Sequence, residues 1–171
     1  MTAPNDHWRE DVFAAFERAG IDYFCYLPDA GLDAFIKKAR EKDGRAIVLT
    51  TEEEGVGICC GAWLGGKRGV LMIQSSGVGN CINTFSLATN CRFPFFLLVT
   101  MRGEFGEGNP WQIPMGSTTQ QALELAGFQV YRAAAPEDAV AMVTSGLQMA
   151  WRSNAQVAVM LSQRLLGAKD M

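Results

Sequence analysis

The sequence predicts an α/β domain in which a doubly wound, mostly parallel sheet of six strands carries helices on both faces. Three observations lead to this fold class. Short apolar runs alternate regularly with segments of helical spacing along the whole chain. Several of these runs are apolar throughout, which is typical of parallel strands buried on both faces. The length of 171 residues suits one domain, and no linker or low-complexity segment divides it.

Six short runs of β-branched, aromatic and aliphatic residues are the expected strands. The connections between them are short and have helical spacing, so right-handed crossovers should lay the strands parallel in one sheet. The expected strands span residues 23–27, 46–50, 70–74, 95–100, 128–132 and 155–161.

Helices are expected where apolar residues recur every three to four positions. Thr51 and Glu54 have the spacing of a capping box, and Pro136 suits the first turn of a helix. Residues 75–80 are expected to form a turn that leads into a helix ending near Leu87. The other helices are expected at 8–19, 32–39, 51–65, 118–126 and 136–152.

The composition excludes two classes of protein. Hydrophobic residues make up 49% of the chain, charged residues only 19%, and the net charge is −3. This acidic balance argues against a nucleic-acid-binding protein, which normally shows a basic patch. The high hydrophobic content argues against a long disordered chain. Low charge beside high apolar content also suggests that a partner covers part of the surface.

The sequence contains neither a secretory signal nor a membrane span. Residues 1–7 are polar and lack the basic segment and apolar core of a signal peptide. Apolar stretches such as 93–99 are far shorter than the roughly 20 residues that cross a bilayer. We therefore expect a cytoplasmic protein.

Three patterns associated with other chemistry are incomplete. The five cysteines lack C-x-x-C spacing, so we interpret them as small buried residues and expect no metal site. The only histidine, His7, is interpreted as an exposed terminal residue and not as a catalytic base. Residues 77–79 (GVG) follow a strand, but the third glycine of a dinucleotide fingerprint would fall at Ile82, and the P-loop lysine is missing. A tight turn beside a ligand is the favoured interpretation.

Carboxylates follow two of the expected strands. Glu52, Glu53 and Glu54 stand where a strand ends and a helix begins, and Asp29 follows the first strand. Negative charge at a helix start is favourable in itself. However, ligands of open parallel sheets bind at the carboxyl ends of the strands. One of the three glutamates, together with Asp29, is therefore a candidate site residue.

Five segments carry a family resemblance, and they occur in the family's order. They are 26–29 (YLPD), 51–58 (TEEEGVGI), 72–80 (MIQSSGVGN), 102–104 (RGE) and 112–116 (QIPMG). Together they resemble the pyrimidine-binding (Pyr) domain of thiamine-diphosphate-dependent 2-oxoacid decarboxylases. The similarity is greatest to sulfopyruvate decarboxylase alpha subunits, with phosphonopyruvate decarboxylases next. The resemblance implies a single Pyr-type domain over residues 1–171.

The resemblance implies a catalytic, cofactor-binding role for Glu52. In the family, a glutamate hydrogen-bonds the aminopyrimidine ring of the cofactor and promotes the tautomer that deprotonates the thiazolium carbon. It stands nine positions before a helix glycine that precedes a bulky pair. Here Gly61 is nine residues after Glu52 and precedes Ala62 and Trp63. A carboxylate among apolar neighbours can share a proton with a ring nitrogen.

The resemblance also implies a catalytic, substrate-contacting role for Asp29. This residue matches the aspartate of the family's Pro-Asp-Ser turn, which handles protons around the decarboxylated intermediate. Ala30 replaces the usual serine, which puts one substrate hydrogen bond in doubt. The residues that match the family's cofactor turn are Gln74, Ser75, Ser76 and Asn80.

Residues 101–116 are expected to form a long loop, and long loops in compact domains are often functional. Arg102 and Gln112 lie in this loop and are candidates for substrate contact. Arginine suits an anionic sulfonate or phosphonate group. An ordinary surface cation in a loop is an equally good interpretation of Arg102.

The family's second domain has no counterpart in the sequence. That domain carries Gly-Asp-Gly and a downstream asparagine, and it holds the cofactor's diphosphate through Mg²⁺. The chain contains no Gly-Asp-Gly and has no room for such a domain. The resemblance therefore implies that a separate beta subunit completes the site, while the chain alone is inactive and can form homodimers.

Three functions stay open on the sequence. The first is the alpha subunit of a decarboxylase that converts sulfopyruvate to sulfoacetaldehyde and CO₂, with thiamine diphosphate as cofactor. The second keeps this chemistry but acts on phosphonopyruvate or another small 2-oxoacid. The third is a non-catalytic regulatory or scaffold subunit of the same fold, against which Glu52 and Asp29 argue.

Overall fold

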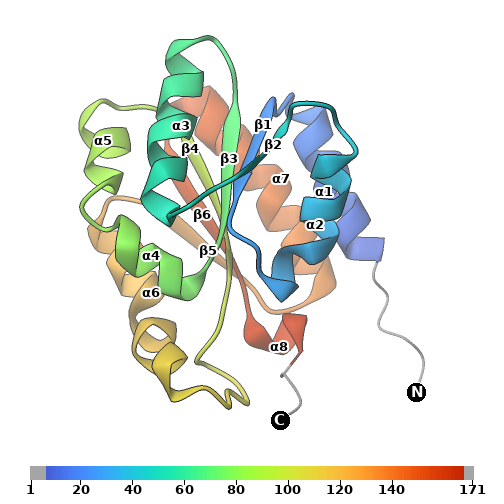
Figure 1. Cartoon of the computed structure of the whole chain (residues 1–171), viewed down its shortest axis with the longest axis vertical. Coiled ribbons are helices and arrows are strands. Elements are labelled where there is room, and N and C mark those ends of the chain that lie inside the picture. Colours follow the sequence, from blue (N-terminus) through green and yellow to red (C-terminus); the bar gives the residue numbers. More distant parts are fainter. Residues whose placement is uncertain (1–6, 168–171) are drawn as a thin grey trace.

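The structure is a computed structural model that describes residues 7–167. A single sheet of six parallel strands forms its centre, in the order β2-β1-β3-β4-β6-β5 (Figure 1). Each strand lies within two residues of its expected bounds. The strands are β1 (Tyr23–Tyr26), β2 (Ala46–Val48), β3 (Gly69–Gln74), β4 (Phe95–Thr100), β5 (Gln129–Ala133) and β6 (Gln156–Leu161).

Helices cover both faces of the sheet, which confirms the doubly wound α/β class (Figure 1). On one face lie α1 (His7–Arg18), α2 (Asp33–Arg40) and α7 (Pro136–Ser153). On the other lie α3 (Glu52–Leu64), α4 (Ser75–Cys81), α5 (Phe85–Asn90) and α6 (Ile113–Leu125). Three shorter elements stand in the connections, namely the 3₁₀ turns at Ala30–Leu32 and Pro110–Gln112 and the one-turn helix α8 (Gln163–Leu166).

The core has two layers because successive strand residues point to opposite faces. Leu98 of β4 packs in the layer beneath α1, α2 and α7, whereas Leu97 packs beneath α3 to α6. All six residues of β4 are buried. The continuously apolar strands are thus buried on both faces, as the sequence predicted.

The expected turn at residues 75–80 is wrong, because this segment is the helix α4. Gly77 and Gly79 do not make a turn here. They let α4 approach its neighbours, since a Cβ on Gly79 would lie 3.1 Å from the sulfur of Met115. The helix expected to end near Leu87 is interrupted after Cys81 and resumes as α5. Turn hydrogen bonds to the carbonyls of Asn83 and Thr84 mark the break.

The expected loop at 101–116 is shorter than predicted, because α6 already begins at Ile113. Pro114 fits there, since the first helical turn needs no backbone donor. Gly116 then packs against the backbone after β4, where a Cβ would lie 2.2 Å from the carbonyl oxygen of Arg102. The helix α8 was not predicted, because one turn is too short to show a periodicity.

The remaining predictions concern surface features and cysteines. Four cysteines are buried, and Cys91 is exposed. His7 begins α1 with an exposed side chain. Within residues 7–167 no helix is long and apolar enough to cross a membrane. The polar segment 1–6, used above to argue against a signal peptide, lies outside the described residues.

Candidate active site

The candidate residues gather at the carboxyl end of the sheet, at its topological switch point. From β1 the chain passes to β2 on one side and then returns to β3 on the other. In open parallel sheets, ligands bind at such a point, beside the side chains that follow these strands. In Figure 1 this end of the sheet is the edge at which α4 and α8 lie.

Asp29 is held by three hydrogen-bond donors. Its Oδ1 accepts from Nε2 of Gln74 at 2.7 Å, and its Oδ2 accepts from the hydroxyl of Thr100 at 2.9 Å and from the amide of Gly31 at 3.0 Å. The hydroxyl of Ser76 donates to Oε1 of Gln74 at 2.9 Å, which fixes the orientation of the amide. The end of β1 is thereby tied to the ends of β3 and β4, and Asp29 faces donors suited to a carboxylate.

Asp29 also lies between two hollows at the surface. One has a volume of about 150 Å³ and is bounded by Arg9, Arg102 and Gln163, among others. The other has about 520 Å³ and includes Arg40. Both hollows have space for a small molecule beside the carboxylate, and both have cationic side chains at their rim.

Glu52 is the first residue of α3 and lies against α4. Its Oε2 accepts a hydrogen bond from Nδ2 of Asn80 at 2.9 Å. A Cβ on Gly77 would lie 2.5 Å from both Cγ and Oε1 of Glu52. Only glycine at position 77 leaves room for the Glu52 carboxylate. The GVG segment therefore accommodates the side chain of Glu52 and not the phosphate of a dinucleotide.

The two glutamates after Glu52 have different environments. Glu54 completes the capping box, and its carboxylate accepts from the amide of Thr50 at 2.7 Å. Glu53 has one buried carboxylate oxygen without a hydrogen-bond partner among the described residues. Burial, and then the charges of Glu52 and Glu53, raise the pKa of Cys81 to about 12. The expected role as helix-start charge therefore suits Glu54, whereas Glu53 carries an unexplained buried acceptor.

Arg102 lies in the expected loop, but its charge is compensated within the chain. Its guanidinium forms a two-pronged ion pair with Glu107, with Nε at 2.6 Å from Oε2. The two side chains are 13% and 4% exposed. The backbone amide of Arg102 donates to the buried Ser75 hydroxyl at 3.1 Å. Ser75 thus anchors the start of the loop.

Gln112 presents an unsatisfied group. Its Oε1 is buried and has no hydrogen-bond partner among residues 7–167. A buried acceptor without a donor is unfavourable, and it is typical of a site that a ligand or a water completes.

One short segment joins the two candidate carboxylates. Gln74, the last residue of β3, bonds to Asp29, and Asn80, near the end of α4, bonds to Glu52. The structure thus brings together seven of the predicted residues, namely Asp29, Glu52, Gln74, Ser75, Ser76, Asn80 and, through its bond to Ser75, Arg102. Among the described residues, no hydrogen bond joins the side chain of Gln112 to them. Sequence reasoning missed Thr100, Glu107 and Gln163, because their partners lie in distant or irregular segments.

The chain is similar to several known proteins. No family model matches the chain. It is 32% identical over 154 residues to the "Sulfopyruvate decarboxylase subunit alpha" of Methanococcus maripaludis, covering 89% of this chain and 92% of the relative. It is 38% identical over 120 residues to the "Sulfopyruvate decarboxylase" of Methanosarcina acetivorans, covering 70% of this chain but only 31% of that protein.

Two further comparisons concern a second decarboxylase and the fold. The chain is 31% identical over 122 residues to the "Phosphonopyruvate decarboxylase" of Streptomyces viridochromogenes, covering 70% of this chain and 31% of the relative. It superimposes with a TM-score of 0.74 on a 2-oxoglutarate:ferredoxin oxidoreductase from Magnetococcus marinus, at 16% identity, covering 93% of this chain and 29% of the other.

The three relatives named above from sequence similarity are all decarboxylases of small 2-oxoacids, and this defines the class of protein. Within this class, the nearly full-length match is to an alpha subunit. The chain belongs to the family of sulfopyruvate decarboxylase alpha subunits.

Proposed function

We propose that this chain is the alpha subunit of a thiamine-diphosphate-dependent sulfopyruvate decarboxylase, and that a separate beta subunit completes its active site. The observation that carries the proposal is the segment from Gln74 to Asn80. It holds Asp29 at one end and Glu52 at the other, at the switch point of the sheet. Both carboxylates lie at the carboxyl end of the sheet, and we assign Glu52 to the cofactor and Asp29 to the substrate.

The residues around Glu52 suit the aminopyrimidine part of thiamine diphosphate. Glu52 is half-buried, its Oε2 accepts a hydrogen bond from Asn80, and its Cγ and Oε1 pack against Gly77. Glu52 would hold a proton between its carboxylate and a ring nitrogen, while Asn80 keeps the carboxylate in place. The bound cofactor supplies the electron sink for cleavage of the carbon–carbon bond.

Asp29 would face the reacting part of the substrate. Its three donors hold the carboxylate in one orientation, which favours positioning of a proton-carrying group beside the substrate. Arg102 and Gln112 are proposed to contact the substrate. Nε and Nη2 of Arg102 are engaged by Glu107, so its remaining Nη1 would serve the anion.

The beta subunit is proposed to hold Mg²⁺ and the diphosphate. Within residues 7–167 no group of three or more His, Cys, Asp or Glu residues could hold a metal ion. The chain covers only 31% of a longer protein that is also named a sulfopyruvate decarboxylase. This supports the proposal that a second domain or subunit is needed besides this one. On this proposal the isolated chain is inactive and binds the cofactor weakly.

The proposal is tested by reconstitution with a beta subunit that contains Gly-Asp-Gly. Each subunit alone should release no CO₂ from sulfopyruvate, and the mixture with thiamine diphosphate and Mg²⁺ should do so. We expect Glu52→Gln to abolish this activity, because the amide cannot hold the required proton on its oxygen. Glu53→Gln is the matched control at the next position and should keep activity within a few-fold. Full activity in Glu52→Gln would disprove the assignment.

Phosphonopyruvate is the second candidate substrate, and the 31% identity to a phosphonopyruvate decarboxylase favours it. Sulfonate and phosphonate differ in charge, so the reconstituted pair should distinguish them by kcat/KM. A higher kcat/KM with phosphonopyruvate would show that phosphonopyruvate is the substrate in place of sulfopyruvate. The assignment of Glu52 would be unaffected.

A further inference from the structure

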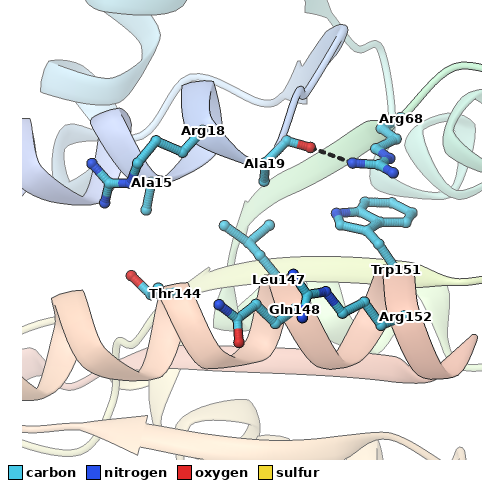
Figure 2. A pocket seen from close by; sticks show the side chains of 9 residues that line it. All are labelled: Ala15, Arg18, Ala19, Arg68, Thr144, Leu147, Gln148, Trp151 and Arg152. Carbon is cyan, nitrogen blue, oxygen red and sulfur yellow. Dashed lines mark hydrogen bonds between the residues drawn. The ribbon is translucent and has the colours of Figure 1, made fainter.

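Another pocket lies at the opposite end of the sheet from Asp29 and Glu52. It has a volume of about 370 Å³ and lies between the end of α1, the start of β3 and the second half of α7 (Figure 2). Arg68 immediately precedes β3, whereas Gln74 ends it. Six strand residues at about 3.3 Å each separate the two sites by roughly 20 Å.

The pocket is lined by cations without a compensating carboxylate. Arg18, Arg68 and Arg152 line it, and none of the nine lining residues is acidic. Neither Arg18 nor Arg152 forms an ion pair within the described part of the chain. By contrast, Arg102, Arg132 and Arg45 each pair with a glutamate. Unpaired guanidinium groups in one hollow attract anions.

Trp151 adds an unsatisfied donor to this pocket. Its indole Nε1 is buried and has no hydrogen-bond partner among the described residues. Trp63 stacks on the ring with centroids 6.1 Å apart, and the guanidinium of Arg68 lies 5.7 Å from the ring centroid. Figure 2 shows the nitrogen edge of the indole turned toward the middle of the pocket. An indole N–H is a donor only, so an acceptor oxygen would satisfy it.

The cations are spread along the pocket and do not converge on one point. In Figure 2 the guanidinium of Arg18 lies beside Ala15, that of Arg152 beside Gln148, and that of Arg68 above Trp151. Arg68 is fixed by its bond to the carbonyl of Ala19 at 2.6 Å. Arg18 and Arg152 come from different helices, α1 and α7. A ligand with two anionic groups fits this spacing better.

We propose that this pocket binds a small phosphorylated molecule that carries at least two anionic groups, with inorganic pyrophosphate as its simplest mimic. Arg18 and Arg152 would each bind phosphate oxygens, and the indole of Trp151 would donate to one of them. The site is separate from the candidate active site and does not depend on the proposed function.

Titration calorimetry of the full chain with pyrophosphate tests the proposal. We expect saturable binding of one pyrophosphate per chain, weaker binding of orthophosphate, and loss of affinity as NaCl rises. The double variant Arg18→Ala, Arg152→Ala should weaken binding at least tenfold. Lys37→Ala removes an exposed cation on α2, outside the pocket, and should leave binding unchanged.

Trp151→Phe tests the indole donor without removing the aromatic ring. It should weaken pyrophosphate binding several-fold while far-UV circular dichroism stays that of the wild type. Absence of saturable binding, or equal binding by the double variant, would overturn the proposal. The proposal would also be overturned if the double variant bound pyrophosphate normally but associated more weakly with the beta subunit. The arginines would then pair with carboxylates of the partner.

Discussion

At the scale of single residues, Gly77 packs tightly against Glu52. Backbone and carboxylate approach so closely that a Cβ would lie 2.5 Å from two atoms of Glu52. Glycine in a helix is otherwise unfavourable by roughly 1 kcal/mol relative to alanine. Its presence in α4 therefore has a cost in stability, which the close packing against Glu52 explains.

Gly77→Ala should separate these two effects. We expect a free energy of unfolding within about 1 kcal/mol of the wild type, because better helix propensity offsets the local crowding. Decarboxylation by the reconstituted enzyme should fall at least tenfold, because Glu52 must move. Urea unfolding and kcat measure the two quantities.

Gly57→Ala is the matched control for this variant. Gly57 lies on the exposed side of α3, and nothing lies within 4 Å of an added Cβ. It should stabilise the chain slightly and leave kcat unchanged. Full activity in Gly77→Ala would show that the position of Glu52 is not critical.

The sequence points to candidate site residues but not to the contacts that they make. Asp29 and Glu52 follow strands and match family positions, so they could be found. Thr100 donates to Asp29 from 71 residues further along the chain, and only the order of the strands brings the two together. One sequence carries no record of such a pair.

At the scale of elements, Glu107 connects the segment after β4 to α8. It accepts hydrogen bonds from Arg102, from the amides of Gly103 and Asn109, and from Nε2 of Gln163 at 3.1 Å. The oxygen of Gln163 in turn accepts from the amide of Phe105 at 3.0 Å. These bonds order a segment whose irregular backbone shows no periodicity, which explains why neither its shape nor α8 was predicted.

Glu107→Gln should destabilise the chain by about 3 kcal/mol, because it leaves the mostly buried Arg102 charge without a counterion. Urea unfolding at pH 7 measures this difference. Glu41→Gln, at an exposed position, should change the unfolding free energy by less than about 0.5 kcal/mol. Equal stability of both variants would show that the ion pair contributes nothing.

The Glu107 carboxylate should also make the free energy of unfolding depend on pH. The hydrogen bonds from Arg102, opposed by burial, lower the pKa of Glu107 from its ordinary 4.5 to about 2. A depressed pKa in the folded state adds stability above the unfolded value, and this stability is lost as pH falls from about 4.5 to 2. Glu107→Gln should show a smaller loss over this range. Parallel pH profiles of the two proteins would contradict the assignment.

At the scale of the whole molecule, one sheet serves two hydrophobic layers. Neighbouring residues of β4 belong to different layers, so neither layer is independent of the central strand. The alternation of apolar runs and helices predicted this architecture and all six strands. The sequence could not predict which surface meets a partner, because exposed apolar residues such as Trp111 and Leu125 have no periodic signature.

Leu97→Ala and Leu98→Ala test the two layers separately. Both side chains are fully buried, and each truncation should cost about 3 kcal/mol. Both variants should unfold in a single transition, because β4 connects the layers. Val48→Ala, at a side chain 58% exposed, is the control and should change little. Two separate transitions in either variant would show that the layers unfold independently.

The distribution of cysteines has a practical consequence for studying assembly. Burial is the main cause that raises the pKa of Cys60 to about 11 and that of Cys81 to about 12, which makes both thiols unreactive toward alkylating reagents. Cys91 is the single exposed thiol of the five and lies just before β4, at the amino end of the sheet. A maleimide dye should therefore label the native chain once, away from Asp29 and Glu52. Its anisotropy would report docking of the beta subunit in real time.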